Sequence, residues 1–247
     1  MIANTQGWLA ATLMAALLAG CAAFGTAPDY QALVANPDRS EADRRTDARR
    51  KPVQLLAFYG VRPGMTVADL GAGAGYNAEL LARAVGPSGK VYAQNSQFVV
   101  ETIVKDGFDK RLQKPVMKNV VHVIREFEDP LPFQANDLDL VTFNFFYHDT
   151  VWLGADRARM NRAIFSALKP GGVLIVADHA GRAGTGVSEA KTLHRIEESQ
   201  LRREVEAAGF RLVAEGGFLR NPNDPRNVSV DASTIPNDEF VLKFVKP

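Results

Sequence analysis

Short apolar runs recur along the chain and alternate with longer amphipathic segments. The apolar runs predict strands at 65–70, 90–94, 119–124, 138–143 and 172–177. The segments between them predict helices near 76–85, 96–106 and 156–168. Strands that alternate with helices in this way build a mainly parallel sheet with helices on both faces. The pattern therefore predicts an α/β fold.

The pattern changes after residue 179. A glycine-rich loop at 181–186 leads to a predicted helix near 198–208, and the apolar segments 210–219 and 239–245 predict an antiparallel pair at the edge of the sheet. The loop between these two segments, 220–237, is long and polar and contains three prolines. Its length predicts either a lid or a mobile excursion.

The segment before the first strand predicts a helical stretch that continues to Gly60. It begins at Ser40, where the sequence up to Asp43 resembles a capping box. Basic and acidic side chains are interspersed over 39–51, so their charges largely offset one another. A solvated helix face is the favoured interpretation of this charge pattern, and a phosphate-binding patch is the alternative.

The first twenty residues form a separate segment. The apolar run from Trp8 to Gly20 is too short for a stable membrane span and has the length of a signal-peptide core. It ends in Leu18-Ala19-Gly20-Cys21, which resembles the bacterial lipobox and implies that Cys21 is lipidated. We therefore predict a signal peptide at 1–20, a lipidated tether at 21–37 and a domain at 38–247. The expected location is outside the cytoplasm, on the periplasmic side of a membrane.

Two alternatives stay open for this segment. Residues 1–7 carry no Lys or Arg, whereas a signal peptide usually begins with positive charge. If translation starts elsewhere, the domain is expected to be cytoplasmic. The other interpretation is a buried N-terminal helix in which Cys21 is incidental.

Composition narrows the possible chemistry. The 247 residues include 29 Lys and Arg against 28 Asp and Glu, so the net charge of +1 gives no bulk field to attract nucleic acid, and none is expected as a partner. A single cysteine excludes an internal disulfide framework, a multi-cysteine zinc site and an iron–sulfur cluster. The four histidines have no metal-ligand spacing along the sequence, so no metal is predicted. The length fits one domain, and the oligomeric state is not predicted.

A glycine-rich loop is the strongest chemical signal. Residues 66–76 read Thr-Val-Ala-Asp-Leu-Gly-Ala-Gly-Ala-Gly-Tyr, in which a buried strand leads into three alternate glycines and then a helix. Glycine permits a sharp turn and the close approach of a ligand to the main chain. A dinucleotide-binding loop would place its third glycine at position 76, so NAD and FAD are disfavoured, and no Lys-Ser or Lys-Thr follows as in a P-loop. The pattern from Asp69 to Gly75 resembles the first motif of class I S-adenosylmethionine-dependent methyltransferases.

Later segments match that family in the expected order. The turn at 86–89 resembles the entry to its second strand, and Leu168 to Leu174 resembles the turn into its fifth. The resemblance implies a Rossmann-like, mainly parallel seven-stranded sheet with an antiparallel C-terminal edge pair, and S-adenosylmethionine as cofactor. It implies cofactor contacts at Asp69, Gly71, Gly73, Gly75, Tyr76, Asn95, Glu126, Phe127 and Asn144.

One of these positions departs from the family. The second strand normally ends in an acid that accepts hydrogen bonds from both ribose hydroxyls, whereas Asn95 stands here. An amide lacks the charge of a carboxylate, so we expect a ribose contact weaker by about 1–2 kcal/mol. Glu126 and Phe127 stand where the family places an acid near the adenine amino group and an apolar residue against the ring.

Candidate catalytic residues follow the fourth and fifth strands. Ligands of open α/β sheets bind outside the carboxyl ends of the strands. His148 and Asp149 follow the fourth strand, and a His beside a carboxylate can act as a base, whereas the alternative is that both cap the next helix. His179 follows the fifth strand and is a second candidate base. His194 is expected to be a surface residue.

Two functional hypotheses follow. The first is an S-adenosylmethionine-dependent methyltransferase with a small-molecule acceptor, because the aromatic stretch from Phe143 to Tyr147 suits a small apolar or aromatic substrate. The second is an exported lipoprotein that uses the same fold as a ligand-binding or accessory module without methyl transfer, which Asn95 and Cys21 favour. Fold analogy does not choose between them.

Overall fold

The computed structural model describes residues 25–247, and seven strands in it form one sheet of order β3-β2-β1-β4-β5-β7-β6. The strands are β1 (Thr66–Leu70), β2 (Lys90–Asn95), β3 (Val120–Ile124), β4 (Leu138–Asn144), β5 (Leu168–His179), β6 (Arg211–Gly216) and β7 (Glu239–Val245). The pairs among β1 to β5 are parallel, and β7 runs antiparallel to both β5 and β6. The predicted fold class is confirmed, including the antiparallel edge pair.

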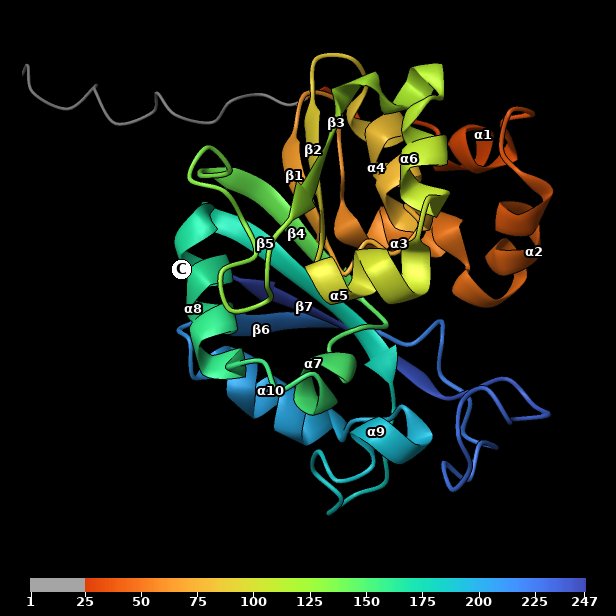
Figure 1. The fold of residues 1–247 in the computed structure, drawn as a ribbon, viewed down its shortest axis with the longest axis vertical. Coiled ribbons are helices and arrows are strands. Elements are labelled where there is room, and N and C mark those ends of the chain that lie inside the picture. The colour runs from red at the N-terminus through yellow and green to blue at the C-terminus, as the bar shows by residue number, and fades with distance from the viewer. Residues whose placement is uncertain (1–24) are drawn as a thin grey trace, which may run out of the picture.

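Helices lie on either side of this sheet (Figure 1). The α-helices are α1 (Tyr30–Ala35), α2 (Glu41–Arg50), α3 (Pro52–Tyr59), α4 (Tyr76–Val85), α5 (Gln97–Val99), α6 (Gly107–Leu112), α7 (Asp149–Trp152), α8 (Arg157–Ala167), α9 (Ala190–Leu193) and α10 (Glu198–Glu206). Two other helical turns are η1 (Val100–Val104), which is π-helical, and η2 (Pro115–Asn119), which is 3₁₀. Helix α4 packs on β1 and β2, whereas α8 packs on β5 and α10 on β6.

Two predicted helices differ from the structure. The helical stretch predicted from Ser40 to Gly60 is broken at Lys51, whose φ is 45°. The segment 96–106 forms the short α5 and the π-helical turn η1 instead of one continuous α-helix. This segment contains several β-branched residues, which lose side-chain freedom in an α-helix, and Lys105 ends it with a φ of 50°. The break brings Val99 and Ile103 to the cavity described below.

The central strand positions the glycine loop. Val67, Ala68 and Leu70 are completely buried, because β1 is covered on both faces and paired on both edges. In register, Asp69 lies beside Ala93 of β2 and Thr142 of β4. The loop that follows β1 therefore begins at the carboxyl end of the sheet, between its two neighbours.

The charged segment before β1 is only partly solvated. Ser40 caps α2 as predicted, since its hydroxyl accepts a hydrogen bond of 3.1 Å from the Asp43 amide. The interpretation of 39–51 as a solvated face is wrong for Arg39 and Asp43, which are 4% and 5% exposed. Both are buried because each has an ion-pair partner, Asp47 and Arg111 respectively.

The predicted signal peptide, the lipobox and Cys21 lie outside the described residues. Within the predicted tether, residues 30–35 form α1, whose Tyr30 hydroxyl donates to the Val61 carbonyl at 2.7 Å. The packed part of the chain therefore begins at least as early as Tyr30. In the described residues no helix combines the length and apolar character needed to cross a membrane.

The loop at 220–237 is fastened to the body by one buried side chain. Arg195 is completely buried, and its guanidinium donates to the Asp224 carboxylate at 2.9 Å, to Asn237 Oδ1 at 3.0 Å and to the Val228 carbonyl at 3.1 Å. These three contacts hold the loop near its start, middle and end.

Candidate active site at the glycine loop

The three glycines of the loop turn the chain at the carboxyl end of β1. All three have positive φ, 59° at Gly71, 56° at Gly73 and 84° at Gly75. A Cβ at Gly71 would lie 2.9 Å from the Phe146 side chain, and one at Gly75 would lie 2.9 Å from Arg111 Cδ. A Cβ at Gly73 would meet nothing within 4 Å. Packing therefore requires the outer two glycines, and the middle one leaves its main chain open to a ligand.

Side-chain amides at the end of β2 hold this loop. The Gly73 amide donates to Asn95 Oδ1 at 2.8 Å, and Asn95 Nδ2 donates back to the Gly73 carbonyl at 3.1 Å. The Gly71 amide donates to Gln94 Oε1 at 3.1 Å. Asn95 is completely buried and does not line the cavity, so the structure gives it a loop-holding role where the sequence predicted a ribose contact.

A cavity of about 360 Å³ opens beside the loop, above the carboxyl ends of β1 and β4. Its volume falls within the range of small-molecule sites. Its lining includes five of the predicted cofactor residues: Asp69, Gly71, Gly73, Tyr76 and Asn144. Phe145 and Phe146 form an aromatic wall of the same cavity.

Two acceptor groups face this cavity from the strand ends. Asp69 accepts hydrogen bonds from Asn77 Nδ2 at 2.7 Å and Thr142 Oγ1 at 2.8 Å, and burial raises its pKa to about 6. It is therefore ionised at neutral pH. Asn144 donates to the Tyr59 hydroxyl at 2.8 Å, while its Oδ1 is buried without a partner in the described part of the chain. A buried acceptor without a partner indicates a donor that a ligand supplies.

A cation completes the polar lining. Arg50 ends α2, and its guanidinium carbon lies 3.7 Å from the centre of the Phe145 ring. It forms no ion pair or hydrogen bond with the side chains of residues 25–247, whereas its neighbour Arg49 pairs with Glu239 at 2.7 Å. Burial, together with Arg49, lowers the pKa of Arg50 to about 10, so the side chain remains charged at neutral pH. The mixed charges of 39–51 gave no sign of this role beyond a small excess of basic residues.

A histidine and aspartate cluster lies beyond the aromatic wall. His148 Nδ1 lies 2.7 Å from the buried carboxylate of Asp178. The other ring nitrogen of His148, Nε2, lies 3.1 Å from Asp149 Oδ1 and 3.3 Å from His194 Nδ1. His179 completes the cluster, with its ring centre 5.5 Å from that of His148 and 5.3 Å from that of Phe145.

Comparison with known proteins decides the family. A family model described as "Methyltransferase domain" matches residues 62–212, which include the glycine loop and the strands around the cavity. The chain belongs to this methyltransferase family. S-adenosylmethionine is its cofactor, as the sequence resemblance implied.

Individual relatives add detail. The ubiquinone/menaquinone biosynthesis C-methyltransferase UbiE of Escherichia coli is 34% identical over 119 residues, which are 48% of this chain and 44% of that protein. The chain thus matches less than half the length of this relative. A methyltransferase from Aquifex aeolicus has a TM-score of 0.59 at 21% identity, covering 83% of this chain and 97% of that one. Fibrillarin from Aeropyrum pernix was solved with natively bound S-adenosyl-L-methionine. It has a TM-score of 0.50 at 15% identity, and the match covers 77% of this chain and 72% of that one.

The cavity fits the methionine portion of this cofactor. That portion carries an α-ammonium and an α-carboxylate. Asn144 Oδ1 and the Asp69 carboxylate could accept hydrogen bonds from the ammonium, and the guanidinium of Arg50, which has no ion-pair partner among residues 25–247, could complement the carboxylate. The open main chain at Gly73 lets the ligand approach between them.

Other predicted cofactor residues lie off this cavity. Gly75 is buried against Phe108. Glu126 accepts a hydrogen bond of 3.4 Å from the Gln97 amide, and Phe127 is buried in a stack with Phe143 and Phe146. Phe127 therefore supports the aromatic wall from behind.

The structure brings the three predicted catalytic residues, His148, Asp149 and His179, into one cluster. His148 precedes α7 but makes no side-chain capping bond, so the capping alternative lacks support. Burial disfavours the charged imidazole of His148, but Asp178 and Asp149 outweigh it and raise its pKa to about 10. The base role of His148 stays a prediction, which this pKa opposes because the ring keeps its proton at neutral pH.

Sequence reasoning missed two members of the cluster. Asp178 was not singled out, although it directly precedes His179 at the end of β5. His194 was expected at the surface, and its side chain is indeed 34% exposed, but it also lies 3.1 Å from Asp149 Oδ1. Only the fold brings residues 148 and 194 together, so spacing along the chain could not reveal the pair.

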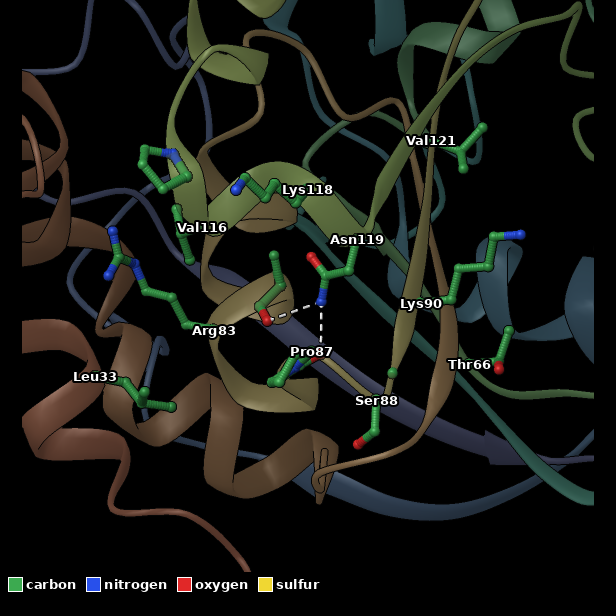
Figure 2. A pocket seen from close by; sticks show the side chains of 14 residues that line it. Leu33, Thr66, Arg83, Pro87, Ser88, Lys90, Val116, Lys118, Asn119 and Val121 are labelled. Carbon is green, nitrogen blue, oxygen red and sulfur yellow. Dashed lines mark hydrogen bonds between the residues drawn. The ribbon is translucent and has the colours of Figure 1, made fainter.

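A larger cavity lies at the opposite end of the sheet. It has a volume of about 840 Å³ and is bordered by Thr66 and Lys90, which begin β1 and β2. Figure 2 shows Leu33, Val116 and Asn119 around it, and Asn119 Nδ2 donates to the carbonyls of Ala82 and Gly86. Cofactors of such sheets bind at the carboxyl ends of the strands, so we assign this cavity no part in methyl transfer.

Proposed function

We propose that this protein transfers a methyl group from S-adenosylmethionine to a small apolar or aromatic acceptor. The observation that carries the proposal is the cavity between the ends of β1 and β4, where Asp69, Asn144 and Arg50 surround the open main chain of Gly73. When bound, the cofactor supplies an electrophilic methyl group on a cationic sulfonium.

The residues of the cavity contribute by positioning. Arg50 holds the α-carboxylate, and Asp69 with Asn144 holds the α-ammonium. With both ends of the methionine portion fixed, the orientation of the methyl group relative to the acceptor is restricted. Proper orientation of two reactants can account for a large part of an enzymatic rate enhancement.

The aromatic wall of the cavity supports the proposed class of acceptor. Phe145 and Phe146 line the cavity, and Phe145 has a φ of 57°, a conformation that is strained for an aromatic residue. Such a turn directs aromatic surface toward the space where an acceptor would lie. The E. coli relative is named for the biosynthesis of ubiquinone and menaquinone, which agrees with an aromatic acceptor.

Methyl transfer can be tested with labelled cofactor. The full chain is incubated with S-adenosylmethionine carrying a labelled methyl group and, separately, with a hydroquinone, a catechol and a naphthol. We expect label in the extracted acceptor and an equal amount of S-adenosylhomocysteine, and both should be lost in an Arg50→Gln variant. Binding of cofactor without transfer to any aromatic or apolar acceptor would contradict the proposal.

We also propose that Cys21 is a lipid-anchored N-terminus in the mature protein, on the strength of its lipobox-like context. Cell fractionation of wild type and a Cys21→Ser variant tests this directly. Release of the variant from the membrane fraction is the expected result. A wild-type chain that is soluble and unprocessed would end the proposal.

A further inference from the structure

The cluster beyond the aromatic wall contains a triangle of ligand atoms. Asp149 Oδ1 lies 3.1 Å from both His148 Nε2 and His194 Nδ1, and these two nitrogens lie 3.3 Å apart. A divalent ion such as Zn²⁺ lies about 2.0–2.2 Å from nitrogen and oxygen ligands, and ligand atoms at that distance are separated by roughly 3.0–3.4 Å. The triangle thus has the dimensions of one face of a metal coordination sphere without any rearrangement.

The hydrogen bonds around the triangle orient the His148 ring so that its Nε2 faces the other two atoms. A carboxylate only accepts, so His148 Nδ1 donates to Asp178 at 2.7 Å. This fixes Nδ1 as the protonated nitrogen that His148 retains, so the proton that a metal ion would displace is the one on Nε2, which faces Asp149 and His194. Three lone pairs that converge in this way require either extra protons or a cation between them.

Asp178 has the position of an orienting carboxylate. It is completely buried. Besides the bond from the His148 ring, its carboxylate accepts hydrogen bonds of 2.8 Å from the backbone amides of His148 and His179. Metal-binding histidines usually donate their second ring N–H to a carboxylate of this kind. Trp152 Nε1 likewise donates to Asp149 Oδ1 at 2.7 Å and holds that carboxylate in place.

We propose that His148, Asp149 and His194 bind one divalent transition-metal ion. Two imidazoles and one carboxylate favour Zn²⁺, Fe²⁺ or a similar ion over Mg²⁺, which prefers oxygen ligands. The exposed fraction of the side chain rises from 3% at His148 to 13% at Asp149 and 34% at His194, so the site is open to solvent on the His194 side. Three protein ligands leave at least one coordination position for water or a substrate oxygen. The inference does not depend on methyl transfer.

The proposal departs from the sequence-based expectation of no metal. That expectation used spacing along the chain, and the ligand pair separated by 46 residues escapes any local pattern. His148 and Asp149 lie at the start of α7, and His194 is the residue after α9. His194 has a φ of 53° there, in the left-handed region, where histidine is more common than most residues other than glycine.

Metal binding can be measured on the full chain without a histidine tag. The protein is dialysed against a chelator and titrated by calorimetry with Zn²⁺, and with Co²⁺ while the visible absorption of the bound ion is recorded. We expect one equivalent to bind, Mg²⁺ to produce no comparable heat, and Co²⁺ to show the spectrum of a site with nitrogen and oxygen ligands.

Variants assign the ligands. His194→Ala and Asp149→Asn should each weaken Zn²⁺ at least tenfold, and Asp178→Asn should weaken it 10- to 100-fold through the orientation of His148. His122→Ala is the matched control, since His122 stacks on Phe108 outside the cluster. The His194 side chain is 34% exposed, so its variant should keep the wild-type circular dichroism and melting temperature. No stoichiometric binding to the wild type, or equal binding to wild type and His194→Ala, would overturn the proposal.

Discussion

Gly73 and Asn95 exchange two hydrogen bonds, from the Gly73 amide to Asn95 Oδ1 at 2.8 Å and from Asn95 Nδ2 to the Gly73 carbonyl at 3.1 Å. This pair joins the middle of the glycine loop to the end of β2. An amide side chain can do this because it both donates and accepts, whereas a carboxylate only accepts. The residue that departs from the family pattern is therefore matched to the backbone of its own loop.

An Asn95→Asp substitution should weaken cofactor binding. The carboxylate loses the donor bond and places a negative oxygen against the Gly73 carbonyl, at a cost of about 1–3 kcal/mol. We expect S-adenosylmethionine to bind at least fivefold more weakly, measured by calorimetry. Asn119→Asp is the matched control, because Asn119 also donates to backbone carbonyls, those of Ala82 and Gly86, at the other end of the sheet. Tighter binding by Asn95→Asp would instead favour a ribose contact.

A methyl group at Gly73 should block the cofactor without unfolding the protein. Gly73→Ala retains a φ of 56° that costs an L-residue about 1–2 kcal/mol, and its Cβ would project into open space. Gly171→Ala has a φ of 75° and equally free surroundings at the opposite end of the sheet. Both variants should lose similar stability in urea, and only Gly73→Ala should lose cofactor binding. Equal affinity in both variants would contradict the proposed location.

Cofactor affinity should fall in acid because of Asp69, whose pKa burial raises to about 6. Protonation removes the charge that faces the ammonium, so affinity should fall about tenfold from pH 7 to pH 5. Arg50 stays charged over this range, and burial raises the pKa values of Tyr59 and Tyr76, so both stay neutral. An Asp69→Asn variant should bind weakly at both pH values, and a wild-type affinity that does not change with pH would contradict this role.

Asp69 should change stability in the opposite direction: cofactor affinity rises with pH, whereas the free energy of unfolding falls. The unfolded carboxyl has a pKa of about 3.9, so between pH 4 and 6 the folded chain binds the proton more tightly than the unfolded chain. This contribution to the free energy of unfolding is therefore lost as pH rises from 4 to 6. Urea unfolding of wild type and Asp69→Asn across this range measures it as their difference.

Removal of the Arg195 guanidinium should release the loop at 220–237. The Arg195–Asp224 pair is fully buried, so Arg195→Met leaves an uncompensated carboxylate and should cost about 3–5 kcal/mol. Arg202→Met breaks a pair that is 46% and 37% exposed and should cost less than about 1 kcal/mol. Urea unfolding gives both values, and limited proteolysis should cut the loop only in the first variant. Equal costs would show that Arg195 does not anchor the loop.

The sequence predicted the sheet and the glycine loop well because both depend on local patterns. A short apolar run bounded by glycines, such as β1, is typical of a buried strand. The strand ends predicted for β2, β4 and β7 agree with the structure to within one residue. Asp69, Gly73 and Asn144 were placed correctly at the cavity for the same reason. Their position follows from which strand they end.

The pattern of apolar and polar residues along the chain could not predict contacts between distant segments. Arg50 lies on a helix outside the sheet, and its approach to Phe145 depends on how α2 packs. His194 meets His148 only because the segment after β5 folds back beside α7. Asn95 was assigned to the ribose from its strand position, but the direction of its side chain depends on the loop above it.

Calorimetric titration of the full chain with S-adenosylmethionine tests the central claim most directly, with Arg50→Gln and Arg45→Gln compared in parallel. Arg50 faces the cavity and has no ion-pair partner in the part of the chain that the structure describes, whereas Arg45 is exposed on the same helix. The account predicts one equivalent bound by wild type and by Arg45→Gln, and at least tenfold weaker binding by Arg50→Gln because a charge-assisted bond to the carboxylate is lost. No binding to the wild type, or the same affinity in both variants, would contradict it.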